Sequence, residues 1–138
     1  MQIKVLFACG DIERASNLYY LIHETYKPLL TNGVYKGKVV FLLDQPDASK
    51  SALFQAFKDA HPYLLEGEQL HLLPVPALEM YYPNPYKKTK QQVDEMNEIK
   101  AKVDLAKVVA SSITEDQLRT EMPIISSMLT KSVELAYE

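Results

Sequence analysis

The chain of 138 residues has little or none of several features, and each absence excludes a class of protein. Its single cysteine, Cys9, excludes an intramolecular disulfide and a cysteine-rich zinc site. No apolar run approaches the roughly 20 residues that a membrane span requires. The formal net charge of -3 excludes a surface that attracts nucleic acid over its whole extent, so any such contact requires a local basic patch.

Glycine is also scarce, with four residues scattered along the chain. They form no glycine-rich phosphate loop, so ATP binding through that loop is not expected. Strand-like sequence begins at the N-terminus and leaves no room for a signal peptide, so we expect a cytoplasmic location. The 47% of hydrophobic residues is enough for a core that needs no disulfide or metal to stabilise it.

The first half of the chain alternates between strand-like and helix-like segments. Three apolar runs are typical of buried strands: 3–9, 38–43 and 70–75. Apolar residues recur at helical spacing over 12–27, and a second helix starts at Asp47 or Ser49, with Leu53 and Phe57 facing inward. The order strand, helix, strand, helix, strand favours a parallel sheet covered by helices.

The second half predicts helices. A tyrosine-rich turn at 77–82 lies between prolines, and a helix over 91–109 follows it. Thr114 and Gln117 have the spacing of a capping box, and Pro123 suits the first turn of a last helix over 123–137. The apolar stripe expected on the 91–109 helix consists of Val93, Met96, Ile99, Val103, Ala106 and Val109.

No flexible linker divides these halves, so we expect a single domain over 1–138. It would have an α/β core over 1–83 and a helical C-terminal extension over 84–138.

Acidic residues follow the first two predicted strands. Asp11 and Glu13 come after the first strand, and Asp44 and Asp47 come after the second. The carboxyl ends of parallel strands meet at one edge of an open α/β sheet, so these side chains are expected there. Mg²⁺ prefers oxygen ligands and binds phosphates alongside one or two carboxylates. The pattern therefore predicts a divalent-metal site suited to polarising a phosphodiester and activating water.

The same acids also have a local interpretation. Asp11 and Asp47 are suited to cap helices, because their side-chain oxygens accept free amides of a first helical turn. Glu13 is then a first-turn acid favoured by the helix dipole, and Asp44 is a turn residue at a strand end. The residues alone leave both interpretations open.

Two further sets of residues are suited to binding or chemistry. Glu79 follows the third predicted strand, so it is either a further ligand or general base at the same edge, or a solvated turn acid. Lys87, Lys88 and Lys90 lie near several tyrosines. Lysines that neutralise phosphates beside tyrosines that stack on bases are typical of single-strand binding, although a solubilising loop has the same composition.

In this order the motifs resemble the Toprim (topoisomerase-primase) domain, in particular that of OLD-type ATP-dependent endonucleases. That family has a strand, E-G-x-x-D, a helix, a strand ending in D-x-D, and a later turn similar to I-E-x-Y-Y-P. Its C-terminal segments K-x-x-L-A-K and V-E-L-A-Y are similar to 102–107 and 133–137 here. The resemblance implies a Toprim-like (Rossmann-like) parallel sheet of about four strands flanked by helices, with a helical C-terminal segment.

The chain departs from this family in its first acidic motif. In the family the first glutamate is regarded as a general acid or base, and the acids that follow bind magnesium. Here Cys9 stands at the position of that glutamate, Gly10 matches the glycine, and Glu13 stands where the aspartate would be. A thiol is a poor substitute for a carboxylate, because magnesium is a hard cation that prefers oxygen.

The later acidic motifs are partly retained. Asp44 matches the first acid of D-x-D, Pro46 stands at the second, and Asp47 comes one residue late. Glu79 matches the acid of the later turn. The resemblance therefore implies Glu13 and Glu79 as catalytic acids, and Mg²⁺ or Mn²⁺ as the cofactor. Its expected ligands are Glu13, Asp44 and Asp47, and its expected nucleic-acid contacts are Lys87, Lys88 and Lys90.

The resemblance implies metal-dependent hydrolysis of DNA or RNA phosphodiesters, weakened or lost because Cys9 replaces the first glutamate. OLD-type enzymes also carry an ATPase domain, so an ATPase domain or subunit is an expected partner. The alternative function is a non-catalytic module that keeps the Toprim fold and binds a protein or nucleic acid.

Overall fold

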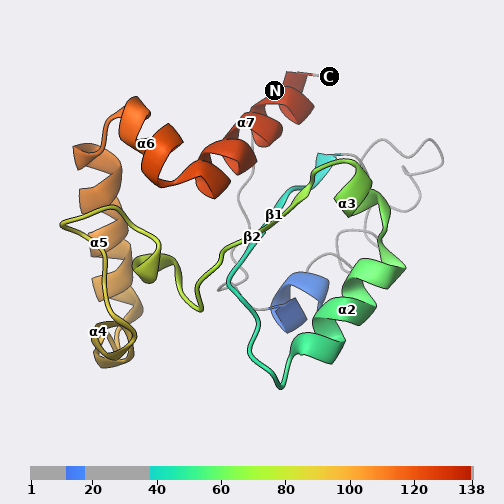
Figure 1. Cartoon of the computed structure of the whole chain (residues 1–138), viewed down its shortest axis with the longest axis horizontal. Helices are drawn as coiled ribbons and strands as arrows, with labels where there is room; N and C mark the ends of the chain where they lie inside the picture. Colours follow the sequence, from blue (N-terminus) through green and yellow to red (C-terminus); the bar gives the residue numbers. More distant parts are fainter. Residues whose placement is uncertain (1–11, 18–37, 138) are drawn as a thin grey trace.

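The computed structural model describes residues 12–17 and 38–137, and within them the protein is a mixed α/β structure (Figure 1). Strand β1 (Phe41–Leu43) pairs in parallel with β2 (Leu70–Leu72), with Phe41 opposite Leu70. Helices α2 (Ser51–Ala60) and α3 (Tyr63–Glu66) connect the two strands. The predicted strand, helix, strand order with parallel pairing is confirmed for this part of the chain.

The sheet of the described residues has two strands. The predicted strand at 3–9 and most of the predicted 12–27 helix lie outside the described residues, while 12–17 is helical as predicted. Strand β2 ends at Leu72, earlier than the predicted residue 75. Pro74 has no N–H to donate to a ladder, which explains the early end.

Helix α2 begins later than predicted, at Ser51. The backbone N–H of Lys50 donates to Oδ1 of Asp47 over 3.1 Å, and the Ser49 hydroxyl donates to the same oxygen. Asp47 therefore stabilises the turn ahead of the helix. Such local side-chain bonds offer the backbone an alternative to helix, which is why the first helical residue moves past them.

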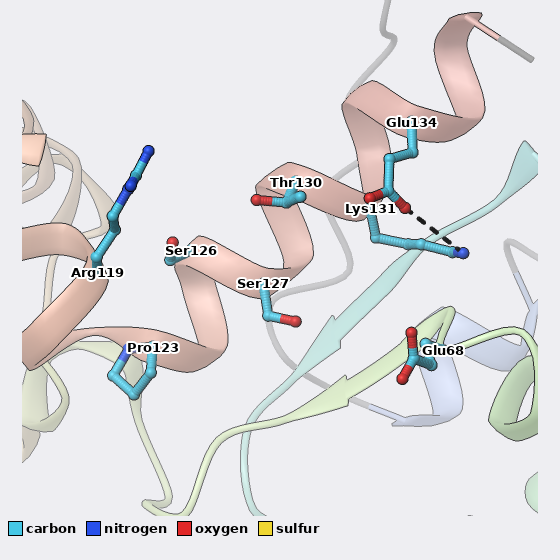
Figure 2. A pocket seen from close by; sticks show the side chains of 8 residues that line it. All are labelled: Glu68, Arg119, Pro123, Ser126, Ser127, Thr130, Lys131 and Glu134. Atoms are coloured by element: carbon cyan, nitrogen blue, oxygen red, sulfur yellow. Dashed lines mark ion pairs between the residues drawn. The ribbon is translucent and has the colours of Figure 1, made fainter.

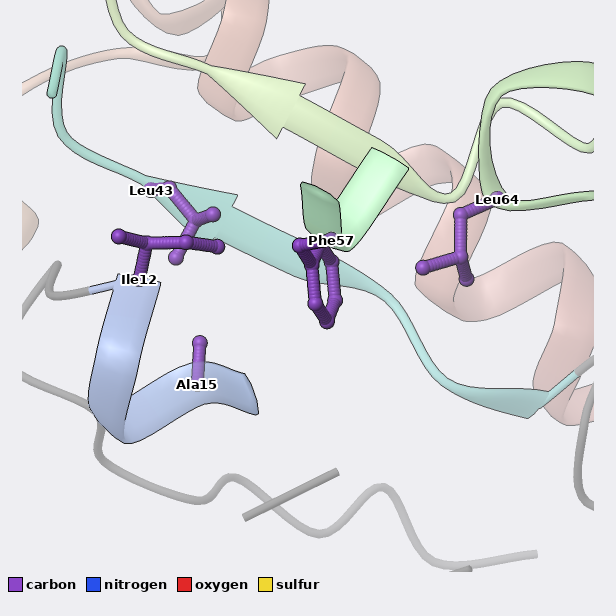
Figure 3. Packing of buried hydrophobic residues seen from close by; sticks show 5 residues of the cluster. All are labelled: Ile12, Ala15, Leu43, Phe57 and Leu64. Atoms are coloured by element: carbon purple, nitrogen blue, oxygen red, sulfur yellow. The ribbon is translucent and has the colours of Figure 1, made fainter. Parts of the chain in front are cut away.

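The first hydrophobic core lies on one side of the strand pair, between β1, α2, α3 and the 12–17 helix. Figure 3 shows Ile12 and Ala15 facing Leu43, with Phe57 and Leu64 further along the same side. Phe57 is buried as predicted and meets Phe41 edge to face, with ring centroids 5.4 Å apart. The prediction for Leu53 is wrong, because it is 39% exposed and half-buried Phe54 packs on the core instead.

The second half of the chain is helical, as predicted (Figure 1). Helix α7 packs against both strands, on the side opposite to α2 and α3. None of the helices in the described ranges is long and apolar enough to cross a membrane. The elements in chain order are η3 (Leu78–Met80), α4 (Lys90–Glu95), α5 (Ile99–Ser112), α6 (Glu115–Glu121) and α7 (Pro123–Tyr137).

The continuous helix predicted over 91–109 is wrong. It is interrupted between α4 and α5, where the N–H of Asn97 donates to the carbonyl of Glu95 over 2.9 Å in a tight turn. The interruption changes which residues of α5 face inward, so Ile99 is 70% exposed and Val103 is 43% exposed. Of the six residues in the predicted apolar stripe, Val93 and Val109 are buried.

Two capping boxes start helices of the second half. The predicted box of Thr114 and Gln117 is present at α6, with both bonds 3.1 Å long. Thr89 and Gln92 form a second box at α4. The sequence analysis missed it, although its Thr-x-x-Gln spacing is the same.

A second core lies between the tyrosine-rich turn and helices α5 to α7. It is built on buried Tyr82, Val109 and Met122. The hydroxyl of Tyr81 accepts a hydrogen bond from the N–H of Ile124 over 3.1 Å and so occupies a free amide at the start of α7. The tyrosine-rich turn is therefore fixed against the last helix.

The core around β1 predicts a difference between two leucine truncations. Leu43→Ala should lower the free energy of unfolding by about 2–5 kcal/mol, because Leu43 is 2% exposed and its loss leaves a cavity. Leu65→Ala should change it by only about 0.5 kcal/mol, because Leu65 is 51% exposed. Urea unfolding followed by circular dichroism measures both. Equal effects of the two substitutions would contradict this packing.

Candidate functional site

Two of the predicted acidic residues, Asp44 and Glu79, lie at the carboxyl edge of the strand pair. Asp44 directly follows β1, and Glu79 lies in η3, which the chain reaches after β2. In Figure 1 both strands run toward the side on which η3 and α5 lie. The N–H of Gln45 donates to the carbonyl of Val75 over 3.0 Å, which holds the two strand exits side by side.

Burial and neighbouring charges both affect the protonation of Asp44, which lies near Glu79. Glu79 is 7% exposed, and its Oε1 lies 3.8 Å from Nζ of Lys102 on α5. Burial and, as a smaller effect, the negative charge of Glu79 together raise the pKa of Asp44 to about 6, and the positive charge of Lys102 partly opposes this rise. Asp44 therefore exchanges its proton close to neutral pH, which is unusual for an aspartate.

Tyr82 lies close enough to Glu79 for the negative charge of that residue to affect the phenol. Burial and, as a smaller effect, the negative charge of Glu79 together raise the pKa of Tyr82 to about 12. The phenol therefore stays protonated at neutral pH. The N–H of Lys88 donates to the carbonyl of Glu79 over 2.9 Å, which ties the lysine-rich loop to the same turn.

The structure places the other predicted acids in separate positions. Glu13 lies on the exposed side of the 12–17 helix, next to Ile12, which packs on the cluster that contains Leu43 (Figure 3). Asp47 is exposed and caps the turn before α2, and the Ser49 hydroxyl is the main group that lowers its pKa. Asp47 thus has a local role in this turn, but its predicted role as the helix cap is wrong, because Lys50 is the N-cap of α2 and no side chain caps that helix. The metal-binding roles of Glu13 and Asp47 stay predictions.

The chemistry of these donors suits a hard divalent cation. Within residues 12–17 and 38–137, no group of three or more His, Cys, Asp or Glu side chains is spaced to hold a metal ion. Asp44 and Glu79 offer two carboxylates, which is the number that Mg²⁺ often takes from a protein when water and phosphate complete its shell. Cys9 and Asp11 lie outside the described residues.

The three predicted nucleic-acid lysines have different surroundings. Lys87 is exposed and lines a groove of about 290 Å³ together with Tyr81 and Tyr82. Lys88 is half-buried, and Lys90 forms an ion pair with Asp94 one helical turn away. Lys87 is thus the one of the three that lines this groove.

A second hollow, of about 270 Å³, lies between α7 and the turn before β2 (Figure 2). Its hydroxyl groups come from Ser126, Ser127 and Thr130. Lys131 lies 3.8 Å from Glu134, and Arg119 on the rim pairs with Glu115 at 2.6 Å. The cations of this hollow lie beside acidic partners, and the groove of Lys87 likewise has Glu121 in its lining. The groove of Lys87 is the one next to the candidate site, because its tyrosines directly follow Glu79.

Sequence reasoning missed two parts of this site. Lys102 was noticed only within a family-like segment, because nothing local shows that it reaches a glutamate far away in the sequence. The groove was also missed, although its tyrosines and Lys87 were singled out. Its walls come from the segment after β2, from η3 and the turn that follows it, and from α6, and a combination of such distant segments has no sequence signature.

The neighbouring charges predict opposite effects of two substitutions on Asp44. Glu79→Gln should lower the pKa of Asp44 toward its ordinary value, because a like charge is removed. Lys102→Gln should raise the pKa of Asp44 above about 6, because a nearby opposing charge is lost. Carboxyl-carbon NMR titration of each variant measures both shifts. A pKa of Asp44 that stays the same in Glu79→Gln would show that the two carboxylates are not neighbours.

Comparison with models of known protein families, with curated proteins and with solved structures finds no match for this chain.

Proposed function

We propose that this protein is a Toprim-like, metal-dependent nuclease that hydrolyses DNA or RNA phosphodiesters. The observation that carries the proposal is the pairing of Asp44 with buried Glu79 at the carboxyl edge of two parallel strands. This edge is where open α/β sheets collect their chemistry. The resemblance of the acidic motifs to the Toprim pattern supports the same reaction. It also implies a sheet of about four strands, to which the predicted strand at 3–9 would add one beside β1 and β2.

The charge balance of the site favours a cation. When both carboxylates are ionised, Lys102 supplies one positive charge against two negative ones. Keeping that excess charge away from water is unfavourable, and the raised pKa of Asp44 is the consequence. A bound divalent cation would relieve it, and it would supply Lewis-acid activation of a phosphodiester and of water.

Each residue of the site then has a role. Asp44 and Glu79 hold the cation, and Lys102 holds Glu79 in place through its ammonium group. By the resemblance, Glu13 and Asp47 assist as further acids. Lys87 and Lys88 contact the nucleic-acid backbone. The family's first glutamate is missing at Cys9, so we expect weak activity.

Metal binding is the first test of this function. Calorimetric titration at pH 7.5 should show submillimolar binding of Mn²⁺. Asp44→Asn and Glu79→Gln should each weaken it by about tenfold or more, because even the loss of an outer-shell partner has an effect of that size. Affinity should fall as the pH drops below about 6, because protonated Asp44 cannot act as a ligand.

The matched control for this titration is Asp104→Asn, which removes an exposed carboxylate from α5 and should leave Mn²⁺ affinity unchanged. A wild-type protein that binds neither Mn²⁺ nor Mg²⁺ below millimolar concentration would eliminate the proposed enzyme.

The replaced glutamate provides a gain-of-function test. Cys9→Glu should raise Mn²⁺-dependent nicking of plasmid DNA by about 100-fold or more, since a positioned acid or base contributes a factor of that order. Cys9→Gln is the matched control, because the side chain of glutamine has the same length as that of glutamate but carries no carboxylate. Equal nicking by the two variants would show that the Toprim alignment of Cys9 is wrong.

A second candidate function is a non-catalytic interaction module. Leu129, Val133 and Tyr137 are 45%, 47% and 81% exposed and are spaced four residues apart on α7, so they share one helix face. An apolar helix face of this kind suits a protein partner, and the resemblance suggests an ATPase domain or subunit. Absence of both metal binding and nicking would leave this function as the better one.

A further inference from the structure

We propose that the nucleic acid is single-stranded and that the groove beside Glu79 holds one of its bases. The inference deepens the proposed function and rests on it, since the base would position its neighbouring phosphate at the carboxylate edge. The groove is lined by Met80, Tyr81, Tyr82, Asn84, Lys87 and Glu121, together with prolines and a valine of the segments after β2 and η3.

The size and position of the groove suit one base. Its volume of about 290 Å³ lies just below the range for drug-sized ligands, which begins at about 300 Å³, and so suits a smaller group such as one base. Met80, Tyr81 and Tyr82 directly follow Glu79 in the chain, and the charge of Glu79 acts on Tyr82. An occupant of the groove therefore lies next to the proposed reaction site.

Tyr81 provides a preorganised aromatic face. Its hydroxyl accepts the hydrogen bond from the N–H of Ile124 over 3.1 Å, so the half-buried ring is held in one orientation. Tyr82, which also lines the groove, is 5% exposed and belongs to the second core, so it anchors this part of the wall. Stacking of a base on a ring that is already ordered loses little side-chain entropy, and every base has a face that can stack.

The polar groups of the groove match the remainder of a nucleotide. Lys87 brings a positive charge suited to a phosphate, while Asn84 and Glu121 offer hydrogen-bonding groups suited to a base edge. The N–H of Lys87 donates to the carbonyl of Pro83 over 3.2 Å, which fixes the backbone from which the lysine extends. A base inside a duplex is stacked and paired, so it cannot enter such a groove without first being flipped out.

The experiment measures binding by fluorescence anisotropy in EDTA, so no divalent cation takes part. An oligothymidylate of about ten nucleotides, within the usual range of single-strand sites, is compared with an abasic strand of equal length. Wild-type protein should bind the oligothymidylate about tenfold more tightly, which corresponds to one stacked base.

Two substitutions of Tyr81 form a matched pair. Tyr81→Phe and Tyr81→Leu both remove the hydroxyl that Ile124 uses, but only phenylalanine keeps an aromatic face. Tyr81→Leu should bind about tenfold more weakly than Tyr81→Phe. Lys87→Gln should reduce the slope of log affinity against log salt by about 0.7, the value for one phosphate contact on a single strand. Lys107→Gln, an exposed lysine of α5, is the control and should leave the slope unchanged.

Three results would overturn the proposal: equal binding of the thymidylate and abasic strands, equal binding by the two Tyr81 variants, or a preference for duplex DNA. The strand comparison uses the wild-type protein, so it holds even if a Tyr81 variant does not fold. Base-dependent binding in EDTA by a protein that binds no Mn²⁺ would support the groove while eliminating the proposed nuclease.

Discussion

The parallel pairing of β1 with β2 is the constraint on which the rest of this structure depends. A parallel pair sends both strand ends to the same edge, so whatever follows Leu43 must meet whatever follows Leu72. Buried Gln69 secures the register. Its backbone carbonyl accepts from the N–H of Phe41 over 2.7 Å, and its side-chain amide donates to the carbonyl of Val39 over 2.7 Å. A slip by one residue would leave these buried groups unpaired and turn Leu43 away from its core.

The helical half of the chain completes this edge. Helix α7 returns to the strands, where the ammonium group of Lys38 donates to the carbonyl of Leu135 over 2.6 Å. The bond from Ile124 to Tyr81 then connects the start of α7 to the turn that follows β2. The tyrosine-rich turn is thus held from both sides, which gives Glu79 and the groove a fixed place relative to Asp44.

The arrangement of charges at the site is unfavourable without a ligand, and the same arrangement suits cation binding or proton transfer. Two carboxylates share a partly buried edge with one ammonium group, and the raised pKa of Asp44 reflects the cost of that arrangement. Such sites are common where a protein binds a cation or transfers a proton, although structural ion-pair networks produce them too. Cys9 matters for the same reason, because the proposed reaction depends on how many carboxylates remain at this edge.

Features that depend on a few neighbouring residues were predicted from the sequence. Local hydrogen bonds explain why the capping box of Thr114 and the helix start at Pro123 were predicted correctly. The apolar residues of 38–43 predicted a strand, of which the structure forms Phe41–Leu43, and the order of elements predicted that Asp44 and Glu79 lie at one edge. The interruption at Asn97 was missed, because the apolar period continues through it and only packing selects the broken form.

The sequence by itself determined the type of most described helices and strands, and the acidic character of their shared edge. Only the tertiary structure decided which charges meet there. Lys102 on α5 pairs with Glu79, which is distant in the sequence. Lys90, by contrast, pairs with Asp94 in its own helix, and Asp47 accepts hydrogen bonds within the turn before α2. The physical reason is range: caps, turns and periodicity act over a few residues, but the pairing of distant charges depends on how whole elements pack.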